Sequence, residues 1–350
     1  THSMTKSIPQ ALNQAINSIL KPLLSCVLVL LLTTACVTTG LATAPSSPWV
    51  PVPLNISSNP LDVAFTDSQH GFLVGSNRLV METNDGGNSW AERAINLPAE
   101  ENFRLISIDF LGDEGWIAGQ PGLLLHSDDA GQNWTRLLLD TKLPGDPYLI
   151  NATGPNKAEL ATTVGAIYRS SDSGKSWQAE VSDAAGAVRD LRRSPDGSYV
   201  SVSGLGNFFS TWSPGDQVWQ PHNRVSSQRV QTMGFQPSGE LWMVTRGAQL
   251  RFNPDGSNPE EWSKPVIPIT NGYGYLDMAW DPNGTIWTGG GNGTLLSSID
   301  GGSHWQRDGV GTATPSNFTR LLFLEDGKGF ALGERGTLLR WVSPDSAEIL

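Results

Sequence analysis

An eight-residue pattern, Ser/Thr-x-Asp-x-Gly-x-x-Trp, recurs four times in this chain and restricts its possible folds more than any other feature. The copies span residues 83–90, 127–134, 170–177 and 298–305. The Asp carboxylate and the Ser/Thr hydroxyl can accept hydrogen bonds from turn amides, the Gly permits a positive φ, and the Trp can pack a hairpin against its neighbour. This element, an Asp-box, predicts tight turns in a repeated β unit. Its aspartates are therefore interpreted as turn caps and not as acids or metal ligands.

The spacing of the boxes predicts seven units. Their aspartates lie at positions 85, 129, 172 and 300, so successive copies are 44, 43 and 128 residues apart. The last step equals three units of just under 43 residues, which predicts two degenerate boxes, at 210–219 and 253–262. A period in the low forties with several short strands per unit is typical of a β-propeller. The even period argues against the alternative of two small β domains.

The two ends of the chain complement each other. The seventh unit stops after a third strand at 336–341 and has no closing Trp, whereas residues 49–53 resemble a box Trp followed by a fourth strand. Prolines in that segment suit an outer edge strand. We therefore expect an all-β fold, a seven-bladed β-propeller of four-stranded antiparallel blades over residues 49–350, in which the N-terminal strand closes the last blade.

The composition excludes several functional classes. The formal net charge is −11, which disfavours a general nucleic-acid binder. The two cysteines, Cys26 and Cys36, lie near the N-terminus, so no disulfide or cysteine–metal framework is expected in the folded body. The chain has no close His pair and no Gly-Lys-Ser/Thr phosphate loop. The sequence therefore predicts neither a metal site nor a cofactor.

The first 48 residues resemble an export leader and a tether. Residues 1–35 contain no acidic side chain, and an apolar run of about ten residues, 23–32, is too short for a mature membrane span but suits a signal peptide. Small residues before Cys36 resemble a bacterial lipobox, although Thr33 stands where Leu is usual. We expect cleavage and lipidation at Cys36, with residues 36–48 as a flexible tether. The alternative is an ordinary signal peptide cut near residues 42–44.

Arginines are concentrated in the middle of the chain. Residues 187–251 contain seven arginines, four acidic residues and no lysine. Because guanidinium groups bind carboxylates bidentately, a cluster on one face suits an acidic or C-terminal peptide partner. The alternative is a scatter of solvated or internally paired arginines around the ring. The candidate partner-binding residues are Arg169, Arg189, Arg192, Arg193, Arg224, Arg229 and Arg246.

The lipobox-like leader, the short tether, the seven Asp-box units and the arginine-rich segments VRDLRRSPDG, NRVSSQRV and TRGAQLRF together resemble the photosystem II assembly and stability factors of cyanobacteria and chloroplasts. The resemblance covers residues 36–350. It implies a non-enzymatic propeller, lipid-anchored on the lumenal side of the thylakoid membrane. It also implies that an arginine patch binds newly made reaction-centre subunits, including the precursor whose C-terminal tail is later trimmed.

Two other functions remain open from the sequence. Asp-boxes also occur in sialidase-type glycoside hydrolases, which need three arginines, a Tyr–Glu nucleophile pair and an Asp acid at the channel mouth. This chain has only five tyrosines and lacks a Phe/Tyr-Arg-Ile/Leu-Pro motif. An outer-membrane lipoprotein scaffold would have the same fold as an assembly factor, and the residues alone do not distinguish the two.

Overall fold

The computed structural model describes residues 46–139, 143–269 and 271–346. Residues 47–350 belong to one compact unit. The predicted leader, most of the predicted tether and Cys36 lie outside the described residues. Within the described ranges no helix is long and apolar enough to cross a membrane.

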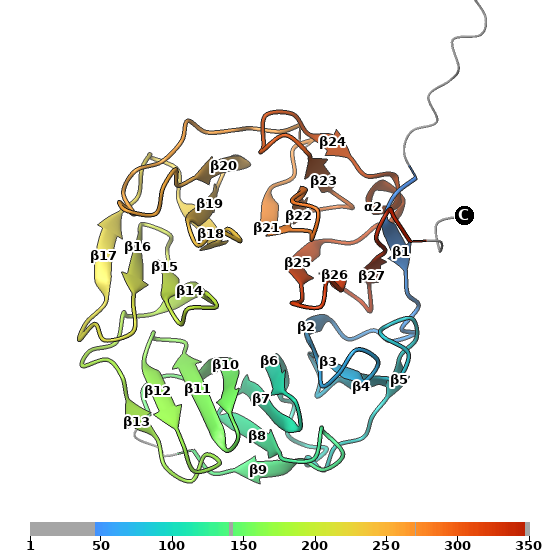
Figure 1. Ribbon diagram of the computed structural model, residues 1–350, viewed down its shortest axis with the longest axis vertical. Coiled ribbons are helices and arrows are strands. Elements are labelled where there is room, and N and C mark those ends of the chain that lie inside the picture. The colour runs from blue at the N-terminus through green and yellow to red at the C-terminus, as the bar shows by residue number, and fades with distance from the viewer. Residues whose placement is uncertain (1–45, 140–142, 270, 347–350) are drawn as a thin grey trace, which may run out of the picture. The chain divides into compact units, whose positions relative to one another are not determined.

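Seven antiparallel sheets are arranged around a central channel, each with its first strand innermost (Figure 1). Blade 1 contains β2 (Pro60–Phe65), β3 (Gly71–Gly75), β4 (Val80–Thr83) and β5 (Ala91–Glu92). Blade 2 contains β6 (Arg104–Leu111), β7 (Glu114–Gln120), β8 (Leu123–Ser127) and β9 (Thr135–Leu137). Blade 3 contains β10 (Pro147–Gly154), β11 (Lys157–Thr162), β12 (Ile167–Ser170) and β13 (Gln178–Ala179). Blade 4 contains β14 (Val188–Arg193), β15 (Tyr199–Ser203), β16 (Phe208–Trp212) and β17 (Gln220–Asn223).

Blade 5 contains β18 (Val230–Phe235), β19 (Leu241–Thr245) and β20 (Gln249–Phe252). Blade 6 contains β21 (Tyr275–Trp280), β22 (Ile286–Gly290), β23 (Leu295–Ser298) and β24 (Gln306–Arg307), and a short helix, α2 (Gly309–Ala313), follows it. Blade 7 contains β25 (Phe318–Phe323), β26 (Gly329–Gly333) and β27 (Leu338–Trp341), and β1 (Trp49–Pro51) is its fourth strand. Trp49 pairs with Trp341, which confirms the predicted closure of the ring.

Blade 5 departs from the four-stranded pattern. Its outer edge is a single antiparallel bridge between Leu250 and Val266 in place of a fourth strand. The preceding turn is one of the two predicted degenerate boxes, and here the Asn253 side chain replaces the missing hydroxyl by accepting a hydrogen bond from the Gly256 amide at 2.7 Å. The turn is therefore retained with a different cap.

The four intact boxes have the predicted turn chemistry. In the first, Gly87 N–H donates to the Thr83 hydroxyl at 3.0 Å, and Ser89 N–H donates to the Asp85 carboxylate at 2.9 Å. The hydroxyl of Thr83 in turn donates to Asp85 at 2.8 Å. Equivalent hydroxyl caps accept from the Gly131, Gly174 and Gly302 amides. The box aspartates are thus held in place by turn amides and hydroxyls.

We expect Thr83→Val to destabilise the protein by about 1 to 2 kcal/mol, because this near-isosteric change removes the buried hydroxyl that accepts from Gly87. Urea denaturation measures the effect. Thr135→Val is the matched control, since Thr135 is exposed on β9. Equal midpoints for the two variants would show that the box hydroxyl does not contribute.

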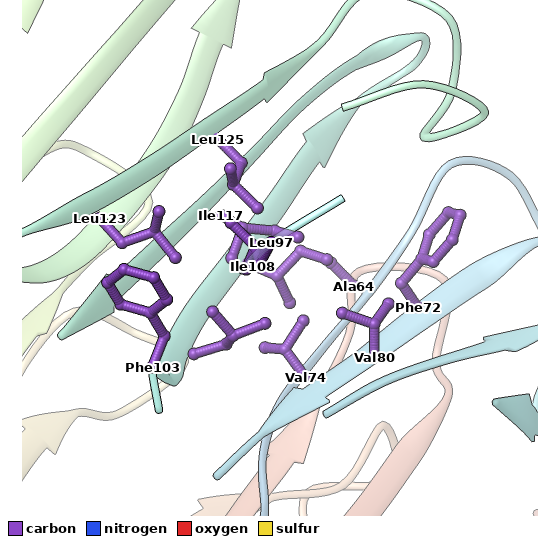
Figure 2. Close-up of a cluster of buried hydrophobic side chains, with 11 residues drawn as sticks. Ala64, Phe72, Val74, Val80, Leu97, Phe103, Ile108, Ile117, Leu123 and Leu125 are labelled. Carbon is purple, nitrogen blue, oxygen red and sulfur yellow. The ribbon is translucent and has the colours of Figure 1, made fainter. Parts of the chain in front are cut away.

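Apolar side chains between adjacent blades form the core. Figure 2 shows the cluster between blades 1 and 2, where Val74 and Val80 of one blade face Ile108 and Ile117 of the next. Box tryptophans extend this packing outward, because Trp134 of blade 2 contacts Phe72 of blade 1. The second strands are buried along their whole length in blades 1, 4, 5, 6 and 7. Contacts between blades therefore hold the ring together, and the box tryptophans contribute to them as predicted from the sequence.

Candidate functional site

The antiparallel blades give the ring two chemically different faces. The turns between first and second strands and between third and fourth strands open on one face, which carries the Asp-boxes and is called the box face. The turns between second and third strands and the connections between blades open on the other, called the crossover face. Hydrogen bonds link neighbouring turns on each face, as in Ala130 N–H to Asp113 O on the box face and Arg246 N–H to Arg229 O on the crossover face.

Charge is distributed unequally between the faces. The box-face turns, from residues 66–70 to 342–346, carry 17 acidic side chains, three lysines and no arginine. On the crossover face, the connections over blades 4 to 6 contain no acidic residue. These connections are residues 204–207, 224–229, 246–248, 267–269, 271–274 and 291–294. This acid-free part of the crossover face, together with Arg189 and Phe208 at the crossover ends of β14 and β16, is called the arginine sector.

Four of the seven predicted partner-binding residues lie in the arginine sector. Arg189 is the second residue of β14 and donates to the Gln231 side-chain oxygen at 3.0 Å, and Arg224 donates to Asn207 at 3.5 Å. The side chains of Arg229 and Arg246 are exposed and make no hydrogen bond or ion pair with a described residue. None of the four is paired with a carboxylate among the described residues, so their positive charges are available to a partner.

The other three predicted residues have internal partners. Arg192 points into the channel, where it bonds Asp190 at 3.2 Å and Asp277 at 3.0 Å. Arg193 and Arg169 both bond the buried carboxylate of Glu159, each at 2.8 Å. The internally paired alternative therefore applies to these three residues, and the exposed patch is smaller than the sequence cluster.

Glu159 is the centre of a buried clamp between blades 3 and 4. The Tyr199 hydroxyl also donates to it, at 2.7 Å. Burial raises the pKa of Glu159, but hydrogen bonds from Arg169, Arg193 and Tyr199 outweigh burial and bring that pKa below its usual value. Tyr199 and Glu159 are 0% and 1% exposed, respectively. This Tyr–Glu pair therefore cannot reach a sugar, in contrast to the nucleophile pair of a sialidase.

Sequence reasoning missed a polar network along the channel. Side chains near the start of the inner strands accept backbone amides of the next blade: Asp62 accepts from Ile108 at 3.0 Å and Asp277 accepts from Leu321 at 2.8 Å. Arg320 pairs with Asp62 at 3.1 Å. The available signal was the recurrence of Asp as the third residue of an inner strand, as in Pro60-Leu61-Asp62, Val188-Arg189-Asp190 and Tyr275-Leu276-Asp277. The network joins adjacent blades and neutralises buried charge.

A cavity of about 430 Å³ occupies the channel beside this network, lined by residues that include Arg104, Tyr148, Asn151, Arg192 and Arg320. Arg192 and Arg320 are already paired with buried aspartates. Among the described residues no group of three or more His, Cys, Asp or Glu side chains is placed to hold a metal ion. Arg192 and Arg320 in the channel are therefore internally paired, whereas the exposed side chains of Arg229 and Arg246 on the crossover face have no carboxylate partner among the described residues.

These features define a class: a seven-bladed Asp-box propeller whose exposed arginines are gathered on the face opposite the boxes. The family model described as photosynthesis system II assembly factor YCF48 matches residues 41–342. The chain belongs to this family, which confirms the resemblance inferred from the sequence.

Relatives cover nearly the whole chain. A protein of Synechococcus sp. (strain RCC307) described as photosystem II assembly lipoprotein Ycf48 is 75% identical over 307 residues, which are 88% of this chain and 93% of the relative. Its counterpart in Synechococcus sp. (strain CC9902) is 66% identical over 319 residues, 90% of this chain and 96% of the relative.

Two solved structures agree with the fold. One, described as YCF48 bound to D1 peptide, is 46% identical with a TM-score of 0.81 and covers 87% of this chain and 99% of its own. YCF48 from Cyanidioschyzon merolae is 36% identical with a TM-score of 0.79 and covers 85% and 99%. Both support the seven-bladed architecture.

Proposed function

We propose that this chain is a non-enzymatic assembly factor for photosystem II. It binds a segment of a newly made or precursor reaction-centre subunit through Arg189, Arg224, Arg229 and Arg246. The observation that carries the proposal is the arginine sector, which presents four guanidinium groups without carboxylate partners among the described residues. The relative solved with a D1 peptide supports a peptide of that subunit as the ligand.

The chemistry of the sector suits a carboxylate-bearing peptide. A guanidinium group offers a planar fork of N–H donors that matches a carboxylate, and such charge-assisted bonds are stronger than neutral ones. Arg229 and Arg246 stand next to each other, since their backbones are hydrogen-bonded at 2.9 Å. Two adjacent forks can hold an acidic side chain and a terminal carboxylate at the same time. The bulk of the box face repels the same ligand because its turns are acidic.

The remaining arginines have a supporting role in this proposal. Arg192 neutralises Asp190 and Asp277 in the channel, and Arg193 and Arg169 hold Glu159 between two blades. They keep β14 in position, and β14 carries Arg189 at its start on the crossover face. Their substitution is expected to act on stability first and on binding through it.

Membrane attachment completes the proposed function. Residues 1–35 act as a lipoprotein signal peptide, Cys36 receives the lipid, and residues 36–48 connect it to the propeller at 49–350. The name lipoprotein given to the relatives supports this anchor. We place the protein at the thylakoid membrane, on the lumenal side, where the segments of reaction-centre subunits that it binds are exposed.

The proposed function predicts that the double variant Arg229→Glu, Arg246→Glu binds a synthetic peptide of the D1 C-terminus with an affinity lower by about 100-fold or more. Two charge-assisted contacts are replaced by repulsion, and each such contact contributes about 1.5 to 3 kcal/mol. Fluorescence anisotropy of a labelled peptide measures the affinity in the absence of lipid.

The matched control is the double variant Lys157→Glu, Lys175→Glu, which makes the same change of net charge with exposed lysines on the opposite side. It should bind the peptide as tightly as the parent. Both double variants should melt like the parent, because the Arg229 and Arg246 side chains have no partner among the described residues. Unchanged peptide affinity in the arginine variant would exclude this face as the docking site.

A further inference from the structure

Apolar side chains protrude from the arginine sector. Five of the exposed large hydrophobic residues of the described chain lie there: Leu205, Phe208, Ile267, Ile269 and Tyr273. Ile269 is 81% exposed and Leu205 is 62% exposed. These five residues are called the apolar fringe. Exposure of several large apolar side chains over the same blades as arginines without carboxylate partners indicates a contact surface.

The structure places the fringe on the same face as the arginines. Leu205 and Phe208 flank Asn207, which accepts a hydrogen bond from Arg224. Ile267 and Ile269 follow Val266, whose bridge to Leu250 directs the chain from the box face toward the crossover face. The ring of Tyr273 lies against Gly291, in the turn between the second and third strands of blade 6. Fringe and arginines thus share one surface over blades 4 to 6.

The apolar fringe resembles a membrane-binding surface and does not resemble a peptide-binding groove. Its side chains are exposed, and none of them lines the channel cavity or either of two further cavities of the propeller. Side chains that anchor a peptide normally fill or form a pocket, because binding energy is concentrated where water is excluded on all sides. Protruding Ile, Leu and Phe next to basic residues are instead typical of proteins that lie on a bilayer surface.

We propose that the arginine sector and its apolar fringe contact the surface of an anionic lipid bilayer directly. The arginines are attracted to negatively charged headgroups, and the fringe enters the boundary between headgroups and acyl chains. The opposite face, with its 17 acidic turn residues, is repelled by the same surface. The charge separation therefore orients the ring with its crossover face toward the bilayer.

This inference goes beyond the proposed function, because it assigns a lipid ligand to the apolar fringe, which the peptide proposal does not use, and a second anionic ligand to the arginines. The proposed anchor is long enough to permit the orientation. Twelve residues lie between Cys36 and Trp49, so the two residues are thirteen Cα–Cα steps apart and can be separated by up to about 45 Å. The longest strands have eight residues, or about 26 Å, so the tether can pass from the box-face end of β1 to a bilayer beneath the crossover face.

Hydrogen exchange on protein-free vesicles tests the orientation with the full chain, whether or not it is anchored. The vesicles contain either phosphatidylcholine alone or phosphatidylcholine with phosphatidylglycerol. On the anionic vesicles we expect slower exchange in residues 204–208, 224–229 and 267–274, and unchanged exchange in the box turns 128–134 and 299–305. Equal exchange on the two kinds of vesicle, or protection of the box turns, would overturn the inference.

Matched variants test the fringe itself. Ile269→Asp is expected to lower partitioning onto anionic vesicles about fivefold, since it replaces an inserted aliphatic group by a repelled charge. Ile299→Asp makes the same change at an 89% exposed Ile in a box turn and should partition like the parent. Any leader or lipid contributes equally to the partitioning of both variants. A difference in partitioning between them therefore shows which face of the propeller contacts the vesicle.

The two proposals can fail independently. Ile269→Asp should leave the affinity for the D1 peptide unchanged, because that measurement contains no lipid. If Ile269→Asp loses peptide affinity and keeps its vesicle partitioning, the fringe belongs to the peptide site and the lipid inference is wrong. If the arginine double variant binds peptide normally while vesicles still protect the crossover face, the peptide proposal fails and the lipid inference stands.

Discussion

Trp49→Ala should lower the free energy of unfolding by about 3 to 5 kcal/mol, the cost of removing a large buried aromatic side chain. Trp49 is 1% exposed and packs edge-on against Trp287, with ring centroids 5.3 Å apart, and against Phe323 at 5.9 Å. Through these contacts it joins β1 to blades 6 and 7. Because β1 is the only strand of its blade that comes from the other end of the chain, its loss also weakens closure of the ring.

Thermal denaturation measures this effect, and a decrease in Tm of about 6 to 10 °C is expected for a domain of this size. Val50→Ala is the control on the same strand, because Val50 is 41% exposed and its truncation should change stability by less than about 0.5 kcal/mol. Similar melting of the two variants would contradict the view that Trp49 closes the ring.

The free energy of unfolding should fall as the pH rises from about 4 to 7. Burial, assisted by the nearby charge of Asp62, raises the pKa of Asp109 to about 7. Between these pH values Asp109 stays protonated in the folded protein but is ionised in the unfolded chain. The folded state therefore binds more protons than the unfolded state, and the free energy of unfolding falls as the pH rises. A shift of this size corresponds to about 2 to 4 kcal/mol. Burial also raises the pKa values of Asp62 and Asp277, which contribute with the same sign.

Asp109→Asn tests this prediction. The neutral side chain keeps an oxygen to accept the Ala152 amide, which Asp109 accepts at 2.8 Å, and it has no charge to bury. At pH 8 the variant should therefore be more stable than the parent, and near pH 4 the two should agree. Urea titrations at several pH values measure both. A pH dependence of equal slope in parent and variant would refute the role of Asp109.

The box aspartates affect the acid side of the profile with the opposite sign. Hydrogen bonds from Ser176 lower the pKa of Asp172 to about 2, and those from His304 lower the pKa of Asp300 to about 2. Between about pH 4 and pH 2 these carboxylates stay ionised in the folded protein but become protonated in the unfolded chain. The stability that they contribute to the folded protein is therefore lost as the pH falls through this range. Stability should therefore be greatest near pH 4, between the two windows.

Much of the architecture could be predicted because a propeller repeats one local unit. Every copy of the box uses only neighbouring residues, such as Thr83, Asp85 and Gly87, so its turn follows from eight residues of sequence. Counting the copies then predicts seven blades, and the unpaired Trp49 predicts the closing strand. The lost outer strand of blade 5 was not predicted, because the Asn253 turn keeps a box-like sequence while the segment after it forms only one bridge.

The candidate site was predicted less completely. The sequence indicated an arginine-rich middle, but Arg192 and Arg193, adjacent in β14, meet different carboxylates from distant segments: Asp277 is 85 residues away from Arg192, and Glu159 is 34 residues from Arg193. The sequence of an arginine-rich segment does not show which of its arginines will pair with carboxylates from distant segments. Only the remaining four have no carboxylate partner among the described residues, and Arg229 and Arg246, which a backbone hydrogen bond brings together, are the exposed pair.

The sequence by itself determined the repeat, the number of blades, the pairing of the two chain ends and the family, because each depends on local turn chemistry or on regular spacing. Only the tertiary structure decided which charges are free. Ion pairs between blades depend on side chains that the ring brings within about 3 Å of each other across long separations in the chain. The same closure separates an acidic box face from a crossover face where exposed arginines and protruding apolar side chains meet, and no local pattern in the sequence specifies that division.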